Sequence, residues 1–166
     1  MRWLVLLTGG LGLLHLWLAG ALQLAPDEAY YWTWSKDLAL SYRDHPPLVA
    51  WLVAAGTALG GDTEVGVRLW FVVLGTALVP LSFVIARRSG ARPGIALLVA
   101  SAGGTSLLGS AGAMLATPET PLVFGWTLGL VGLLGLATRE RPMRDGVLLA
   151  LGTAVAVASK LTGILL

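Results

Sequence analysis

The chain has 166 residues, of which 56% are hydrophobic and 12% are charged, and its formal net charge is +2. Soluble domains carry about 25% charged residues, so the charges here are too few to cover a water-facing surface. A soluble globular protein and a disordered chain are therefore both excluded. The sequence has no cysteine, which excludes disulfides, thiolate metal sites and a cysteine nucleophile.

Long segments without charge predict an all-α integral membrane protein. A helix needs ~20 mostly apolar residues to cross ~30 Å of hydrocarbon. The gaps between charged residues predict about five transmembrane helices, at 3–24, 67–86, 94–115, 121–138 and 147–166. A cleaved signal peptide is the competing interpretation of residues 1–22. The apolar stretch from Leu48 to Leu59 is too short to cross and suits a helix at the membrane interface.

Basic residues in the short loops predict the orientation, because Lys and Arg collect on the cytoplasmic side. With the N-terminus in the cytoplasm, the inner set is Arg2, Arg87, Arg88, Arg92, Arg139, Arg141 and Arg144, and the outer set is Lys36, Arg43, Arg68 and Lys160. The loops at 25–64 and 116–121 then lie outside. We expect a multi-pass protein of a bacterial-type plasma (inner) membrane, with its polar loops on the outer, periplasmic side.

The first outer loop begins with two acids that allow two interpretations. Asp27 and Glu28 follow Pro26, a pattern typical of the first turn of a helix, where carboxylates meet the positive end of the helix dipole. The same acids could act as a general base or metal ligand at the membrane surface. The aromatic residues that follow suit either an interfacial aromatic belt or a platform for a sugar ring or an isoprenoid chain: Tyr30, Tyr31, Trp32 and Trp34.

The densest polar cluster of this loop runs from Tyr42 to Pro47. Two consecutive prolines make the backbone extended and stiff, so Asp44 and His45 are held in place. A carboxylate and an imidazole could bind a divalent cation, but two ligands do not specify a metal. Solvated loop charges explain the same residues equally well.

Three further charged residues fall on the outer side. Glu119 is the one charge of the second outer loop, and is either a polar turn at a span boundary or a third acid converging with Asp27 and Asp44. Arg68 and Lys160 either bind an anionic lipid phosphate or extend to the interface. His15, in the middle of the first span, is expected to form an interhelical hydrogen bond.

No Gly-rich phosphate loop, Rossmann fingerprint, zinc-protease motif or nucleophile elbow is present. The cytoplasmic loops are too short to bind a nucleotide. We therefore expect no nucleotide cofactor and no nucleic-acid partner, and any donor substrate must come through the membrane or from outside.

The segment DEAYYWTWSKDLALSYRDHPPLVAWL resembles the first outer loop of integral-membrane glycosyltransferases that use polyprenyl-phosphate sugars. This is the glycosyltransferase family 39-like group, with the protein O-mannosyltransferases and the aminoarabinose transferases of lipid A. The resemblance continues in family order through three shorter pieces, at 67–69, 116–122 and 158–162.

The resemblance implies a GT-C-like fold with short amphipathic helices in the first outer loop. It implies sugar transfer at the outer face from a polyprenyl-phosphate donor to a lipid, glycan or protein acceptor, with membrane lipids as further partners. Asp27 and Glu28 correspond to the family's acidic pair, with Asp27 the general base. Asp44 corresponds to a metal or acceptor contact, and His45 follows it.

The remaining site residues also come from the resemblance. Glu119 stands where the family commonly has Asp, and Arg68 and Lys160 become contacts of the donor phosphate. The substrate-binding set is Tyr30, Tyr42, Asp44, His45, Arg68, Glu119 and Lys160, with Asp44 and His45 also as ligands of a divalent metal ion.

Family enzymes are several hundred residues long, so we expect this chain to be the N-terminal, truncated part of an enzyme, or one half completed by a second chain. The alternatives are a non-catalytic membrane partner subunit, an inactive remnant or a small transporter. The transporter fits poorly, because coupling residues normally lie near the bilayer midplane.

Overall fold

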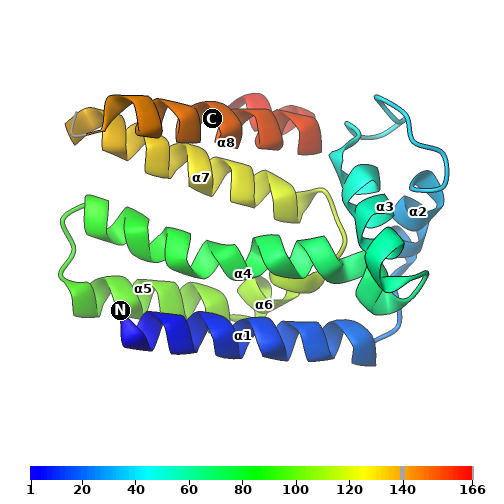
Figure 1. Ribbon diagram of the computed structural model, residues 1–166, viewed down its shortest axis with the longest axis horizontal. Coiled ribbons are helices and arrows are strands. Elements are labelled where there is room, and N and C mark those ends of the chain that lie inside the picture. The colour runs from blue at the N-terminus through cyan, green and yellow to red at the C-terminus, as the bar shows by residue number, and fades with distance from the viewer. Residues whose placement is uncertain (139–140, 166) are drawn as a thin grey trace.

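The computed structural model describes residues 1–138 and 141–165, and these contain helices and no strand. Helices α1, α4, α5, α7 and α8 lie side by side along the long axis, and α2 and α3 cover one end (Figure 1). The elements are α1 (Arg2–Ala21), α2 (Pro26–Trp34), α3 (Leu48–Gly60), α4 (Glu64–Arg88), α5 (Pro93–Thr105), α6 (Leu107–Met114), α7 (Glu119–Thr138), α8 (Pro142–Ser159) and the 3-10 segment η1 (Leu161–Leu165).

Three of the described helices, α1, α4 and α7, are long and apolar enough to cross a membrane. The pair α5 and α6 adds a fourth crossing if it is counted as one span bent by 66°. The expected all-α membrane fold is confirmed, with three or four such segments among residues 1–138 and 141–165 where five were expected. Where the fifth span is expected, at 147–166, the structure has the 18-residue helix α8 followed by η1.

The third expected span, 94–115, is divided by a break at Ser106. This residue is in an extended conformation, and its hydroxyl accepts a hydrogen bond from the Gly109 N–H at 3.0 Å. It therefore serves as the N-cap of α6. The new helix start explains why a continuous apolar segment forms two helices.

Helix α4 is the centre of the bundle and packs against α1, α3, α5, α6 and α7. One buried cluster joins α2, α3 and α4 at the end of the bundle, and a second joins α1, α4 and α5. Tyr31 and Phe71 belong to the first cluster, and Leu11 and Val79 to the second. Many other large apolar side chains are exposed, as expected for a surface that faces lipid.

Helices α7 and α8 form a close antiparallel pair through glycines (Figure 1). Gly125, Gly129, Gly132 and Gly135 are buried along α7, and Gly152 faces them from α8. A Cβ atom on Gly125 would lie 2.7 Å from the Gly152 carbonyl oxygen. The absence of side chains at these positions lets the two backbones approach closely, as in other lipid-embedded helix pairs.

The loop at 25–64, which is predicted to lie outside the membrane, is fixed to the bundle by its two short helices, as the resemblance implies. Helix α3 packs against α2 and α4, with Val49, Ala50 and Val53 buried. Asp62, just after α3, pairs with Lys36 and accepts a hydrogen bond from Trp32 Nε1 at 2.9 Å. These contacts connect the end of α2 to the turn between α3 and α4.

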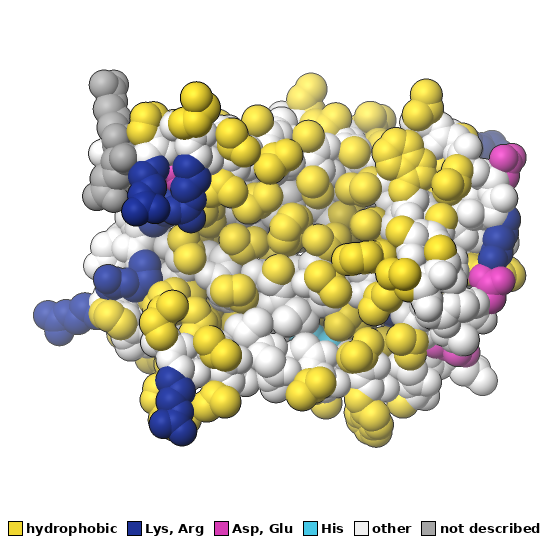
Figure 2. Space-filling model, in the orientation of Figure 1, with side chains coloured by type: hydrophobic (Ala, Val, Ile, Leu, Met, Phe, Trp, Pro, Cys, Tyr) yellow, Lys and Arg dark blue, Asp and Glu magenta, His cyan; other side chains and the backbone are white. Residues whose placement is uncertain are grey.

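The two ends of the bundle differ in charge. Figure 2 shows Lys and Arg gathered where α4 ends and α8 begins, with an apolar surface across the middle of the molecule. The visible Asp and Glu side chains lie mainly at the opposite end, the end that α2 and α3 cover (Figure 2). This is the distribution that the loop charges predict.

Candidate functional site

Glu28 is the most enclosed acid at the α2 end of the molecule. Its side chain is 0% exposed and accepts four hydrogen bonds. Arg68 donates from Nε to Oε1 at 2.7 Å and from Nη2 to Oε2 at 2.5 Å. The backbone N–H groups of Ala25 and Ala116 each donate at 2.9 Å. The carboxylate thereby joins the start of α2 to α4 and to the connection between α6 and α7.

Arg68 uses all five of its N–H donors inside the protein. Besides the two bonds to Glu28, Nη1 donates to the carbonyl oxygens of Ala19 and Leu22 at 2.9 and 2.6 Å, and Nη2 donates to that of Gln23 at 2.9 Å. An arginine has five such donors and no more. In this conformation Arg68 closes the C-terminal end of α1 and has no donor left for a phosphate.

The hydrogen bonds keep Glu28 ionised. Burial alone would raise the pKa of this carboxyl, but the hydrogen bonds from Arg68, Ala116 and Ala25 bring it below the usual value of 4.5. A carboxylate with four donors around it has no free lone pair directed at a substrate. The geometry thus favours Asp27 over Glu28 as the base of the predicted acidic pair.

Asp27 lies in the same first turn of α2 but is exposed to solvent. One turn further along the helix is Tyr31, with only 8% of its surface exposed. Burial is the largest cause that raises the pKa of the Tyr31 phenol to about 12, and the negative charges of Glu119, Asp27 and Asp44 contribute to the same rise. Acids from α2, the following loop and α7 therefore all act electrostatically on one phenol, and their meeting at one site stays a prediction.

Asp44 is held within this group by aromatic residues. Its Oδ2 accepts a hydrogen bond from the Tyr30 hydroxyl at 3.1 Å. The His45 ring lies 6.0 Å from that of Tyr31 and 6.5 Å from that of Trp34, measured between centroids. The structure thus brings Tyr30, Asp44 and His45 together against α2.

Tyr42 shapes the loop. Its ring stacks on that of Trp34 with centroids 4.5 Å apart and planes within 2°. Its hydroxyl accepts from the Ala39 N–H at 3.1 Å and lies within hydrogen-bonding distance of the carbonyl oxygens of Trp34 and Asp37. The hydroxyl contacts the protein backbone and the ring packs on Trp34, so Tyr42 stabilises the conformation of the loop.

The end of α8 returns to the same region. Lys160, the C-cap of α8, donates to Glu119 Oε1 at 2.7 Å, and both side chains are partly exposed, 33% and 53%. Glu119 also borders an apolar cavity of about 480 Å³ between α4, α6 and α7, with Leu78 and Val123 in its wall. Lys160, unlike Arg68, is a cation at this end that solvent can reach.

A second cavity, of about 470 Å³, lies between the first outer loop and the end of α8. Its lining includes Tyr42, Asp44 and His45 from the loop and Val157 and Leu161 from the other side. Of the predicted site residues, Asp44 and His45 are therefore beside a space that could hold a substrate, whereas Glu28 and Arg68 are closed off in the core.

The described residues at this end of the molecule do not form a complete ligand set for a divalent metal ion. Among the residues that the structure describes, no group of three or more His, Asp or Glu side chains could hold a metal ion. Asp44 and His45 are adjacent, and Asp44 already accepts from Tyr30. The metal stays a prediction, and no chemical step below depends on it.

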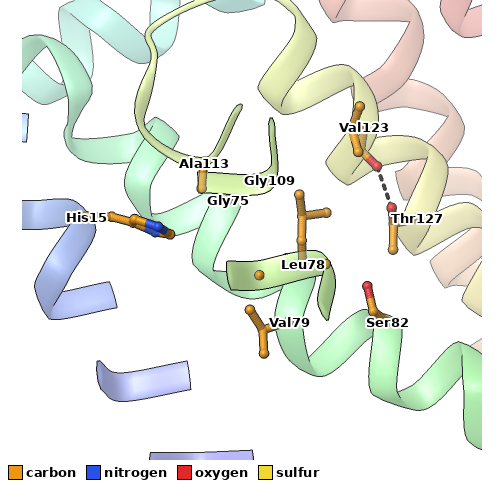
Figure 3. A pocket seen from close by; sticks show the side chains of 11 residues that line it. His15, Gly75, Leu78, Val79, Ser82, Gly109, Ala113, Val123 and Thr127 are labelled. Atoms are coloured by element: carbon orange, nitrogen blue, oxygen red, sulfur yellow. Dashed lines mark hydrogen bonds between the residues drawn. The ribbon is translucent and has the colours of Figure 1, made fainter. Parts of the chain in front are cut away.

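His15 differs from its expectation. The side chain is 1% exposed, and neither ring nitrogen has a hydrogen-bond partner in the described part of the chain. It points toward a cavity of about 140 Å³ between α1, α4, α6 and α7, with Ser82 and Thr127 on the far side (Figure 3). Thr127 donates to the Val123 carbonyl oxygen rather than to His15, so the expected interhelical hydrogen bond is not formed.

The sequence does not single out Tyr31 as a buried phenol beside acids, because it is one of four aromatic residues that suit a belt or a platform equally. A signal was present, because residues four apart on a helix face each other and Tyr31 follows Asp27 by four. The Glu28–Arg68 pair had no such signal, since its partners lie on separate helices.

Comparison with known proteins gives the family. Residues 44–166 match the family described as dolichyl-phosphate-mannose-protein mannosyltransferase. The chain belongs to this family. The match includes Asp44, His45 and Glu119 and begins after Asp27 and Tyr31. The fold, an all-α membrane protein, agrees with it.

Two curated relatives extend the similarity. Lipid A galacturonosyltransferase RgtD of Rhizobium johnstonii is 27% identical over 138 residues, covering 81% of this chain and 28% of the relative. An uncharacterized protein of Aquifex aeolicus is 29% identical over 117 residues, covering 63% of this chain and 23% of the relative. The chain thus spans less than a third of the length of either relative. No solved structure matches the chain.

Proposed function

We propose that this chain carries the acidic part of the active site of an enzyme that transfers a sugar from a polyprenyl-phosphate donor to a lipid, glycan or protein acceptor. The observation that carries the proposal is an exposed acid, Asp27, at the end of the molecule where Asp44 lines one cavity and Glu119 borders another, in a member of a mannosyltransferase family. A lipid A galacturonosyltransferase among the relatives supports the transfer of a sugar at a membrane.

Asp27 is the proposed general base. The acceptor hydroxyl attacks the anomeric carbon, its proton passes to the Asp27 carboxylate, and the bond from that carbon to the phosphate oxygen breaks. One base positioned at the acceptor suffices for an inverting transfer. Asp27 has the exposure that this role needs, whereas Glu28 holds Arg68 in the core.

The leaving phosphate needs positive charge, because negative charge develops on it in the transition state. Lys160 is the proposed contact, since it is partly exposed and its partner Glu119 borders the apolar cavity. That cavity, lined by Leu78 and Val123, suits the isoprenoid chain of the donor. The cavity beside Asp44 and His45 suits the sugar or the acceptor.

The multi-pass chain is proposed to lie in a bacterial inner membrane with its N-terminus in the cytoplasm and the acidic end in the periplasm. The excess of arginine at the other end supports this orientation. The expected second chain has no support in the family or in the relatives. A non-catalytic partner subunit or an inactive remnant remains the alternative function.

The test replaces Asp27 by Asn in the protein as it occurs in its native membrane. We expect sugar transfer from a polyprenyl-phosphate donor to fall by about 100-fold or more, with unchanged membrane insertion. Asp37→Asn is the matched control, because Asp37 is an exposed acid of the same loop that does not act on Tyr31.

Full transfer by the Asp27→Asn protein would overturn the assignment of the base. Equal losses in both variants would mean that loop charge, rather than a positioned carboxylate, matters. If membranes with the natural protein show no more sugar transfer than membranes without it, and neither variant changes that level, the non-catalytic alternative holds.

A further inference from the structure

The end of the molecule opposite the acidic site has a basic cavity that sugar transfer does not use. Its volume is about 630 Å³, and it lies between the end of α4, the end of α7 and the start of α8. Arg87 and Arg88 line it from α4, and Arg141 and Arg144 line it from the start of α8. Figure 2 shows Lys and Arg side chains at this end of the molecule.

The charges of the cavity are far from balanced within the described residues that line it. Asp145 is the one acid there, and it pairs with Arg88 Nη2 at 2.9 Å while only 3% exposed. Arg88 also donates to the Val131 carbonyl oxygen from Nη1. The hydrogen bonds of Arg88 are thus made within the protein, and the other three guanidinium groups give the described part of the lining a net positive charge.

These three arginines remain exposed. Arg87 has one donor on the Ala91 carbonyl oxygen at 2.6 Å, which leaves others available, and Arg141 and Arg144 lie on the surface. Guanidinium groups hold phosphate oxygens through paired, charge-assisted hydrogen bonds. An anion between α4 and α8 would relieve the repulsion among them.

The wall of the cavity also contains apolar residues. Phe83 and Val84 lie about one turn into the apolar part of α4, and Thr138 ends α7. One part of the cavity wall is therefore charged, and the other part is apolar and lies toward the membrane-spanning part of α4. Basic pockets between membrane helices are known to take anionic lipid head groups, and this polarity suits a phosphate with the first part of an acyl chain attached.

Orientation alone does not explain the arrangement. The tendency of basic residues to stay in the cytoplasm concerns their number in short loops, and does not require four of them to line one cavity. Arg2 and Arg92 would contribute equally to that tendency, yet neither is part of the lining.

We infer that this cavity binds the phosphate group of an anionic glycerophospholipid from the membrane leaflet at that end. The lipid would join α4 to α8 beside the Arg88–Asp145 pair, through the arginines that this pair leaves uncompensated. This site is independent of the proposed sugar transfer.

The experiment purifies the protein from vesicles of phosphatidylcholine with phosphatidylglycerol, and counts the phospholipids retained per protein by native mass spectrometry. We expect selective retention of phosphatidylglycerol by the natural sequence, and a loss of about tenfold in the Arg141→Gln, Arg144→Gln variant. The Arg2→Gln, Arg92→Gln variant is the matched control, since it removes the same charge outside the cavity, and should retain the lipid.

A second variant keeps charge and topology constant. Arg141→Lys with Arg144→Lys preserves both positive charges but not the paired hydrogen bonds, and should retain an intermediate amount of phosphatidylglycerol. Equal losses in the cavity variant and in the Arg2, Arg92 control would overturn the inference in favour of diffuse surface attraction.

The source of the phosphate is tested separately. Short-chain phosphatidylglycerol and inorganic phosphate are compared for their effect on the thermal unfolding midpoint of the delipidated protein. Stabilisation by the lipid, reduced in the Arg141→Gln, Arg144→Gln variant, supports the inference. An equal effect of inorganic phosphate alone would identify a soluble anion and overturn it.

Discussion

Asp27 and Glu28 are consecutive in the chain but face opposite environments. Glu28 points into the core, where its two oxygens take four hydrogen bonds, and Asp27 points into the solvent beside Tyr31. Neighbouring positions on a helix are separated by about 100°, and here that step separates an exposed side chain from a buried one. The pair therefore divides into one acid for structure and one that is available for chemistry.

Replacing Glu28 by Gln should destabilise the protein strongly. The change leaves the charge of Arg68 buried, and the new amide group directs N–H donors at the donors of Arg68 or Ala25. Breaking a buried pair from one side costs roughly 3–5 kcal/mol. The thermal unfolding midpoint in detergent measures the loss, with Asp27→Asn, an exposed neighbour, as the control that should stay near the natural value.

The pH dependence separates this pair from a general packing defect. The pKa of Glu28 is lower in the folded protein than its ordinary value of 4.5. The pair therefore contributes its full stability above about pH 4.5, and this is lost as the pH falls through the folded pKa. The Glu28→Gln protein should lack this acid-dependent part, and an identical pH profile in both proteins would contradict the role assigned to Glu28.

The loop charges predict Asp27, Asp44 and Glu119 as acids of one outer surface, and all three carboxylates help to raise the pKa of Tyr31. The sequence does not predict that Arg68 donates all its hydrogen bonds to Glu28 and to the carbonyl oxygens at the end of α1. Local pattern gives the side of the membrane on which a residue falls. Which of two partners a guanidinium contacts depends on how separate helices pack.

At the scale of elements, α7 and α8 depend on the small volume of their glycines. A Cβ atom on Gly132 would lie 2.6 Å from the Asp145 carbonyl oxygen, and one on Gly152 would lie 2.6 Å from that of Gly125. Real side chains do not approach backbone so closely, so the helices would have to separate. Close packing of this kind is the main source of attraction between helices in lipid.

Gly152→Ala should therefore lower stability by about 1–3 kcal/mol, the usual cost of overpacking. Gly146→Ala is the control on the same helix, since a Cβ atom there meets nothing within 4 Å. Alanine is the better helix former by up to ~1 kcal/mol, so the control should be neutral or stabilising. Thermal unfolding of both variants in the same detergent checks the prediction, which fails if they behave alike.

The elements themselves could be predicted well where charge and length decide them. The helix expected from Leu48 to Leu59 is observed as Leu48–Gly60, and the spans expected at 67–86 and 121–138 lie inside α4 and α7. The break between α5 and α6 was missed, because counting charge-free residues does not detect a bend. Ser106 before the α6 sequence was the available signal, as a hydroxyl residue at that place favours a new helix start.

At the scale of the whole molecule, both ends carry charge, but of different kinds. The α2 end has acids beside two cavities, one between the loop that follows α2 and the end of α8 and one between α4, α6 and α7. The other end has arginines around one cavity. A sugar donor linked to a lipid phosphate needs an exposed base and a cation at its own end. The proposed chemistry and the proposed phospholipid site therefore lie on opposite sides of the bilayer and do not compete.

Cysteine labelling tests this orientation directly, because the natural sequence has no cysteine. Leu38→Cys introduces a thiol into the first outer loop, where Leu38 is 57% exposed, and Ser89→Cys introduces one into the exposed turn between α4 and α5. A membrane-impermeant maleimide should label Leu38→Cys once the outer barrier of the cell is opened, and Ser89→Cys only after the inner membrane is permeabilised. The reverse pattern would place Asp27 in the cytoplasm and contradict the proposed outer-face transfer. It would leave the arginine cavity intact but move its lipid to the outer leaflet, so one experiment decides the side on which each site must be sought.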